Sequence, residues 1–283
     1  MKSAMTVLAS VVLGGGAVGA GLLVPFDRSA PLEYEPAAPW QSFEDAPYDS
    51  QYHFARIRYG AGGGFGGGRG FGRGRGRGGP MWAHDYPRAD YNFLAILDET
   101  TYVRTGRASS NVVSLDQEDF FRHPITYMVE VGYWDPSDEE VEAMGDYLRK
   151  GGFLIVDDTR NERGFEFRNF ATNMSRALPD LSFQRVDNDH EIFDSFFRID
   201  PMAVIPPYGR YPVEYWALFE DNDPAERMLV LLNLNNDIAE YWEFSDRGYY
   251  PIDLANEAYK LGVNYVIYGM TPVSYTHLTL PTI

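Results

Sequence analysis

Apolar and polar positions alternate along the second half of the chain in a pattern that predicts strands and helices in turn. The clearest example is Gly151–Asp158, where four apolar residues precede two carboxylates. Such a run is typical of a buried parallel strand that ends at an open edge of the sheet. Ligands of open α/β sheets bind in the crevice at the carboxyl ends of the strands, so this segment also marks where a site is expected.

Residues 125–157 predict a strand, a helix and a second strand joined by short connections. Residues 125–131 alternate and are rich in β-forming types, and the capping-box sequence Ser137–Glu140 begins a helix that extends to Lys150. Gly151 follows at the position where a glycine commonly ends a helix. A βαβ unit of this kind is expected to be parallel and right-handed.

The rest of the pattern extends this arrangement over an expected domain at residues 81–272. We expect further helices over 91–102, 165–178 and 255–269, and further strands over 112–113, 181–186, 215–219 and 228–234. Strands that alternate with helices at this spacing predict an α/β fold with a doubly wound, mainly parallel sheet and helices on both of its faces.

The first 24 residues predict export across the cytoplasmic membrane. Residues 1–24 combine Lys2, an apolar run and a stretch of small residues, as a signal peptide does. The apolar character continues to Val24, which is close to the length of a membrane span, so a retained N-terminal anchor is the alternative. Either form would deliver the rest of the chain to a periplasmic or other extracytoplasmic location.

Three other segments are expected to lie outside the domain. Residues 25–59 are rich in Pro, acidic and aromatic residues and predict a tether or an edge extension. Residues 60–80 predict a flexible Gly/Arg-rich linker; an RNA-binding arginine-glycine box is the alternative, which export disfavours. Residues 273–283 resemble the translation of sequencing-adapter DNA, so we leave them out of the fold.

Charge and cysteine content exclude several functions. Residues 81–283 carry 16 basic and 35 acidic side chains, and such an acidic domain repels phosphate backbones, so nucleic acid is not expected as a partner. The chain has no cysteine. Disulfides, thiolate metal sites and a cysteine nucleophile are thereby excluded.

Several motifs, in a consistent order over about 190 residues, resemble the domain of unknown function 4159 family, which is placed among class I glutamine amidotransferase-like folds. They are Tyr86–Phe93, Gly151–Asp158, His190–Phe193 with Phe196-Phe197, Asn235–Asp237 with Tyr241-Trp242, and Tyr259–Tyr265. The resemblance implies a flavodoxin-like sheet in exported or membrane-linked bacterial proteins, and it implies no established reaction.

The chain departs from this family at two places. Relatives usually have a proline after the central histidine, where Glu191 stands here, and the Thr-His pair that often ends their last helix is lost after Thr271. Folds of this kind normally place a cysteine nucleophile on a sharp strand-to-helix turn. Since cysteine is absent, we do not expect glutaminase or amidotransferase chemistry.

Acidic and imidazole side chains near the predicted strand ends are the candidates for chemistry. The candidate catalytic residues are Asp157, Asp158, His190 and Asp237. Paired carboxylates suit divalent metal binding or general acid/base catalysis, because neighbouring like charges raise one pKa. The candidate metal ligands are Asp157, Asp158 and His190, with His190 meeting Asp157 across the crevice. No organic cofactor is predicted.

These candidates also have structural roles as alternatives. Asp158 is placed to start an Asx-turn, and His190 to satisfy a loop carbonyl. Asp157 is placed to bond the side chain of Arg160 or Arg163.

Three further residues are candidates for ligand binding. Asn235 and Asn236 follow the buried strand 228–234 and are placed either to line the crevice or to form a turn. Arg88 is placed to reach the crevice or to pair with Asp90 and fix the first helix.

These observations favour an exported, non-catalytic domain that binds a small ligand or an envelope or membrane protein at the strand ends. One alternative is a hydrolase that uses the carboxylates and His190, with or without a divalent metal. Another is a structural component of a cell-envelope complex. Convergence of the candidate residues at one edge of the sheet would favour a site over scattered structural roles.

Overall fold

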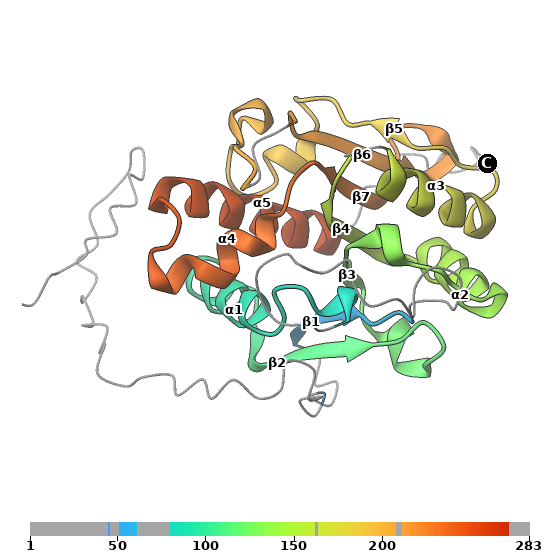
Figure 1. Ribbon diagram of the computed structural model, residues 1–283, viewed down its shortest axis with the longest axis horizontal. Coiled ribbons are helices and arrows are strands. Elements are labelled where there is room, and N and C mark those ends of the chain that lie inside the picture. The colour runs from blue at the N-terminus through green and yellow to red at the C-terminus, as the bar shows by residue number, and fades with distance from the viewer. Residues whose placement is uncertain (1–44, 46–50, 61–79, 162–163, 208–210, 272–283) are drawn as a thin grey trace, which may run out of the picture. The chain divides into compact units, whose positions relative to one another are not determined.

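A seven-stranded, mostly parallel sheet forms the centre of the protein, and its strand order is β2-β1-β3-β4-β7-β6-β5 (Figure 1). The computed structural model describes residues 45, 51–60, 80–161, 164–207 and 211–271. The strands are β1 (Tyr52–Ile57), β2 (Thr105–Val113), β3 (Ile125–Val129), β4 (Phe153–Thr159), β5 (Gln184–Arg185), β6 (Glu214–Phe219) and β7 (Met228–Leu234).

Five of these strands run parallel, and two at one edge do not. Strands β2, β1, β3, β4 and β7 pair in parallel, whereas β6 is antiparallel to β7 and β5 is antiparallel to β6. The helices are α1 (Arg88–Thr100), α2 (Asp138–Arg149), α3 (Phe165–Ala177), α4 (Ile238–Phe244) and α5 (Ile252–Met270). The predicted α/β class is confirmed.

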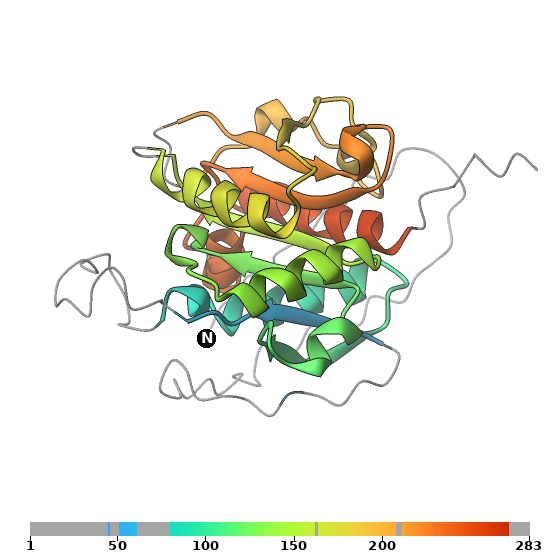
Figure 2. The same cartoon turned by 90° about the vertical axis from the view of Figure 1, so that its right-hand side faces the viewer.

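Two apolar cores separate the sheet from its helices. Alternate residues of β4 point to opposite faces, so Phe153 and Ile155 pack with α1, α4 and α5, whereas Leu154 and Val156 pack with α2 and α3. Figure 2 shows α2 and α3 together in front of the strands. Within the helices that the structure describes, none combines the length and apolar character needed to cross a bilayer.

The βαβ unit at the centre of the sheet follows the sequence pattern closely. Ser137 caps α2 by accepting a hydrogen bond from the backbone N–H of Glu140, and the Glu140 side chain accepts one from the backbone of Ser137. Gly151 adopts a φ of 111°, which favours glycine, and β3 and β4 pair in parallel. The predicted capping box and the parallel pairing are confirmed.

The sheet begins before the predicted domain boundary. The prediction placed residues 25–59 in a tether or edge extension, but β1 lies between β2 and β3 and every one of its residues is buried. The polar residues Arg56 and His53 interrupt the apolar pattern of this segment, so the sequence did not predict a strand there. The predicted strand at 112–113 is also much too short, since β2 spans Thr105–Val113, and α4 was not predicted.

Three predicted segments fall on parts of the chain that are not described. The targeting segment at 1–24 and the foreign tail at 273–283 lie outside the described residues, as does the Gly/Arg-rich linker at 60–80 except for its first and last residues.

Candidate metal-binding site

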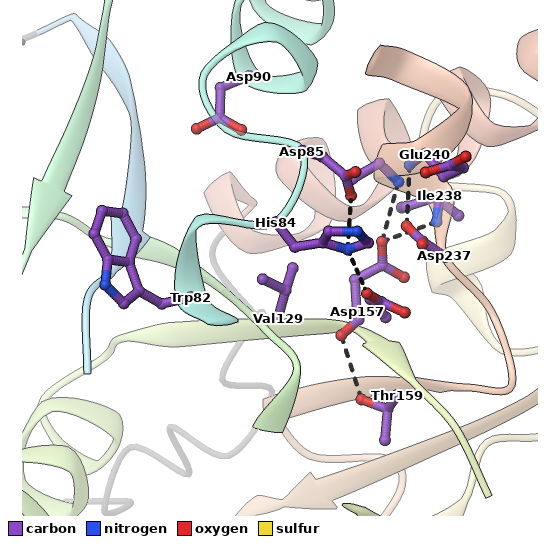
Figure 3. A network of polar contacts seen from close by, with 12 residues as sticks. Trp82, His84, Asp85, Asp90, Val129, Asp157, Thr159, Asp237, Ile238 and Glu240 are labelled. Atoms are coloured by element: carbon purple, nitrogen blue, oxygen red, sulfur yellow. Dashed lines mark hydrogen bonds and ion pairs between the residues drawn. The ribbon is translucent and has the colours of Figure 1, made fainter. Parts of the chain in front are cut away.

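Polar side chains from four connections meet where the parallel strands end (Figure 3). His84 and Asp85 lie between β1 and α1, Glu130 directly follows β3, Asp158 lies at the end of β4, and Asp237 lies between β7 and α4. Because the carboxyl ends of parallel strands share one edge of a sheet, these connections are brought together by the fold. This is the edge of the sheet at which the sequence predicted a site.

A hydrogen-bonded pair of His84 and Asp158 is the centre of the site. Nδ1 of His84 lies 2.7 Å from Oδ2 of Asp158, and the Asp158 side chain is fully buried, whereas that of His84 is 36% exposed. Arg160 donates to the other carboxylate oxygen of Asp158 at 3.1 Å. Asp158 is therefore held on both oxygens.

Opposing effects set the pKa values of this pair. Burial acts to lower the pKa of His84, but the hydrogen bond and negative charge of Asp158 outweigh it and raise the pKa to about 9. Burial likewise acts to raise the pKa of Asp158, yet His84 and Arg160 hold that pKa below its usual value. Without a ligand, the pair is an imidazolium and a carboxylate at neutral pH.

Asp237 completes a set of three donors. One donor atom from each of His84, Asp158 and Asp237 lies within 4.8 Å of the other two. Oδ1 of Asp237 accepts the backbone N–H of Glu240 at 3.0 Å, but Oδ2 is buried and has no hydrogen-bond partner within the described structure. Burial, followed by the charges of Asp158 and Asp85, raises the pKa of Asp237 well above its usual value.

Asp85 is a buried carboxylate with no hydrogen-bond donor on either oxygen among the described residues. Its side chain is 1% exposed, and Oδ2 lies 3.6 Å from Nδ1 of His84. One donor atom each from His84, Asp85 and Glu240 forms a second set within 4.8 Å. Burial and the charges of Asp158, Glu243 and Glu240 raise the pKa of Asp85 well above its usual value.

Glu130 adds another buried acid beside these sets. It follows β3 with a left-handed φ of 52°, and it is 9% exposed. Burial, followed by the charges of Asp158 and Glu166, raises the pKa of Glu130 to about 9. The site thus gathers three buried carboxyl groups, those of Asp85, Glu130 and Asp237, whose pKa values burial and neighbouring acidic groups raise.

A buried arginine holds the loop that carries His84. The Arg56 guanidinium donates to the backbone oxygens of His84 at 3.0 Å and Trp82 at 3.4 Å. It also makes two hydrogen bonds to the carboxylate of Asp90, which accepts a third from Ser110. Arg56 and Asp90 are completely buried, so this pair fixes the loop to β1 and α1.

Asp157 has a structural role that the sequence did not specify. Its Oδ2 accepts hydrogen bonds from the Tyr127 hydroxyl at 2.7 Å and from the backbone N–H groups of Ile238 at 2.8 Å and Ala239 at 3.2 Å. Its Oδ1 accepts from the Asn233 amide at 3.0 Å. The expected bond from Asp157 to Arg160 is wrong, because Arg160 binds the neighbouring Asp158. The alternative partner, Arg163, lies outside the described residues.

His190 does not join the other candidates. Its Nδ1 accepts the backbone N–H of Ile192, and its ring contacts Phe219, which pairs with Met228 at the start of β7. Asp157 contacts Asn233 near the other end of β7, and five residues of strand span on the order of 16 Å. The predicted contact between His190 and Asp157 is therefore wrong, since the two residues lie near opposite ends of the strands.

The asparagines after β7 take part in local structure. Asn235 has a φ of 61°, accepts from the backbone of Asn161 at 2.9 Å and donates to the backbone of Pro212 at 3.0 Å. Asn236 forms an isolated β-bridge with Thr159, and its buried amide has no hydrogen-bond partner among the described residues.

Arg88 does not form the local pair that the sequence suggested. Its guanidinium bonds both carboxylate oxygens of Asp246, at 2.7 and 2.5 Å, while Asp90 pairs with Arg56. The predicted pairing of Arg88 with Asp90 is wrong, because Asp90 points to β1.

The sequence missed three residues of the two donor sets: His84, Asp85 and Glu240. His84 and Asp85 directly precede the Tyr86–Phe93 motif. They would have been found if β1 had been recognised, because the segment that follows a central strand lies at the carboxyl edge.

An α/β domain with a polar site at the carboxyl ends of its parallel strands is the class of protein that this fold and geometry define. The chain belongs to the family described as Domain of unknown function (DUF4159), whose profile matches residues 53–270. The match begins inside β1 and ends at the last residue of α5. A comparison with curated proteins found no match. The resemblance drawn from the sequence motifs is confirmed at the level of the family.

Proposed function

We propose that this chain is a divalent-cation-binding domain that holds the cation through His84, Asp158 and Asp237 and uses it to bind a small ligand or partner. The observation that carries the proposal is the Asp237 carboxylate, which lies beside His84 and Asp158 and whose buried Oδ2 atom has no hydrogen-bond donor among the described residues. Leaving such a group unmatched costs about 1–3 kcal/mol or more for a charge. A cation would remove that cost.

The type of donor suggests which cations fit. One imidazole nitrogen with two carboxylate oxygens suits Zn²⁺ or Mn²⁺, whereas Ca²⁺ and Mg²⁺ favour sites made of oxygen alone. Binding of a cation at His84 requires the ring nitrogen to be unprotonated, so it would compete with the proton that Asp158 stabilises.

Metal-assisted hydrolysis is a second candidate function, favoured by the partial exposure of His84. Catalytic zinc sites usually have three protein ligands and leave a position for water or substrate, and a bound cation lowers the pKa of its water. The set of His84, Asp158 and Asp237 has that number of ligands, and the 36% exposed His84 side chain offers an approach from solvent. Hydrolysis of simple esters or glycosides by the Zn²⁺-loaded or Mn²⁺-loaded chain, lost in Asp158→Asn, is the expected signature.

The finer fold assignment and the cellular location are also proposals. The order β2-β1-β3-β4-β7 of the parallel strands matches the flavodoxin-like order, which supports a doubly wound, amidotransferase-like fold. The pattern of residues 1–24 supports export. We therefore expect the ligand to be a small molecule, or an envelope or membrane protein, outside the cytoplasmic membrane.

Thermal unfolding of the metal-free full chain tests cation binding. At a concentration 100 times Kd, a cation stabilises the native state by about 2.7 kcal/mol, which raises Tm by roughly 5–11 °C for a domain of this size. Asp237→Asn should lose this shift and still fold, because asparagine caps α4 as well as aspartate does. The matched control is Asp146→Asn, an exposed residue paired with Lys150, which should keep the shift.

Two results would overturn the proposal. One is the absence of a Tm shift in the wild-type chain with each of Zn²⁺, Mn²⁺, Mg²⁺ and Ca²⁺. The other is a shift in Asp237→Asn equal to that of the wild-type chain.

A further inference from the structure

We propose that the same edge of the sheet binds a second divalent cation between Asp85 and Glu240, so that the centre is binuclear. This inference rests on the proposed function, because the first cation occupies the adjacent set of His84, Asp158 and Asp237.

The first argument is the geometry of the two donor sets. The set of His84, Asp85 and Glu240 shares its imidazole with the first set, and the donor atoms of each set lie within 4.8 Å of one another. Both cation positions would therefore adjoin the same imidazole. Nδ1 of His84 is nearer to Asp158, at 2.7 Å, than to Asp85, at 3.6 Å. His84 is therefore assigned to the first cation.

Asp85 supplies an independent observation. Its carboxylate is buried, and both of its oxygens lack hydrogen-bond donors within the described structure. The residue is held at this place by its left-handed φ of 61°, and the backbone oxygen of the preceding His84 is fixed by Arg56. A bound cation would stabilise a buried carboxylate that has no hydrogen-bond donor on either oxygen.

A tyrosine hydroxyl fixes the orientation of the Glu240 carboxylate. The Tyr250 hydroxyl donates to Oε1 of Glu240 at 2.7 Å, which fixes the carboxylate and leaves Oε2 for the cation. Asp237 and Glu240 are linked in turn, since Oδ1 of Asp237 accepts the backbone N–H of Glu240. One carboxylate of each cation position, Asp237 or Glu240, thus lies at the N-terminal end of α4 (Figure 3).

The balance of charge agrees with two cations. Asp85, Asp158, Asp237 and Glu240 together carry four negative charges when ionised, which two divalent cations neutralise. A single cation would leave Asp85 and Glu240 uncompensated at short range. Asp85 is buried and Glu240 is half-buried, so this carboxylate pair remains as a site when only the first position is occupied.

Titration of the full chain with Mn²⁺ alone tests the second position. Calorimetry in about 0.15 M salt, which screens weak surface binding, should give two Mn²⁺ ions per wild-type chain. Electron paramagnetic resonance should show the exchange-coupled spectrum of an adjacent pair. Asp85→Asn should bind one ion with an uncoupled spectrum, and it should fold because asparagine tolerates a positive φ.

Matched variants distinguish this inference from the function on which it rests. Glu240→Gln should also bind one ion, and Tyr250→Phe should weaken the second site about tenfold while its charge is unchanged. The control Glu257→Gln, partly exposed and paired with Lys260, should bind two. If the wild-type chain binds one uncoupled ion, the inference of a second cation position is overturned and the first position is retained. No bound ion overturns both, and two ions in Asp85→Asn overturn the assignment of Asp85.

Discussion

Replacement of Asp157 by alanine should destabilise the protein far more than replacement of its neighbour Asp158. The Asp157 carboxylate accepts four hydrogen bonds from buried donors, whose lengths run from 2.7 to 3.2 Å. Asp157→Ala leaves the Tyr127 hydroxyl, the Asn233 amide and two backbone N–H groups of α4 without their acceptor. Each unmatched buried donor costs about 1–3 kcal/mol.

The net effect is smaller than the sum of these costs. Removal of the carboxylate also removes a buried charge. Water that enters the vacated space can accept hydrogen bonds from some of the donors. We expect the free energy of unfolding to fall by about 4 kcal/mol, which lowers Tm by roughly 8–16 °C for a domain of this size. In the metal-free chain, Asp158→Ala should lower Tm by less than half as much, because its partners His84 and Arg160 are partly exposed and can bond water instead.

Urea and thermal unfolding of the metal-free chain, followed by circular dichroism at one protein concentration, measure both changes. Asp157→Asn is an informative third variant, since rotation of the Asn233 amide would let an asparagine oxygen and amide replace the two carboxylate oxygens. Its Tm should fall between those of the wild-type chain and Asp157→Ala. A fall of less than about 3 °C in Asp157→Ala, or an equal fall in Asp158→Ala, would refute the reasoning.

Three further predictions concern residues outside the two donor sets. Arg56→Met should destabilise the chain by about 3–5 kcal/mol, because it leaves Asp90 buried without its partner, and calorimetry should show weaker cation binding because the His84 loop loses its support. Burial, aided by His53, lowers the pKa of His123 to about 4, so the unfolded chain takes up a proton that the folded chain resists. Stability should fall by about 3 kcal/mol as the pH drops from 6.5 to 4, and pH-dependent urea unfolding should show a smaller fall in His123→Gln. Gly262→Ala should cost about 1–3 kcal/mol in urea unfolding, since a Cβ atom there would lie 2.4 Å from the Trp242 ring.

The central elements of the fold could be predicted because their signals are local. Strand β4 begins with four apolar residues and β7 with five, and the capping box of α2 is contained in four adjacent residues. In contrast, β1 contains Arg56, which is buried only because Asp90, 34 residues away, neutralises it. A buried polar residue of this kind is recognisable only after its partner in the fold is known.

The candidate site was predicted in part, for a similar reason. Asp158 and Asp237 were predicted because they follow apolar strands, and the structure brings them together. Successive residues of a strand point to opposite sides, but the sequence could not show which of Asp157 and Asp158 would meet donors. His190 was placed wrongly because the connection after β5 turns back along the sheet, so that the His190 ring contacts Phe219 at the end of β6.

Anomalous X-ray scattering from crystals of the full chain grown with Mn²⁺ tests the central claim most directly. The account predicts a peak within about 2.0–2.3 Å of a ring nitrogen of His84 and of a carboxylate oxygen each from Asp158 and Asp237. The peak should be absent in Asp237→Asn crystals prepared in the same way. Peaks confined to other surfaces, or the same peak in Asp237→Asn, would contradict the claim that these three residues form a metal-binding site.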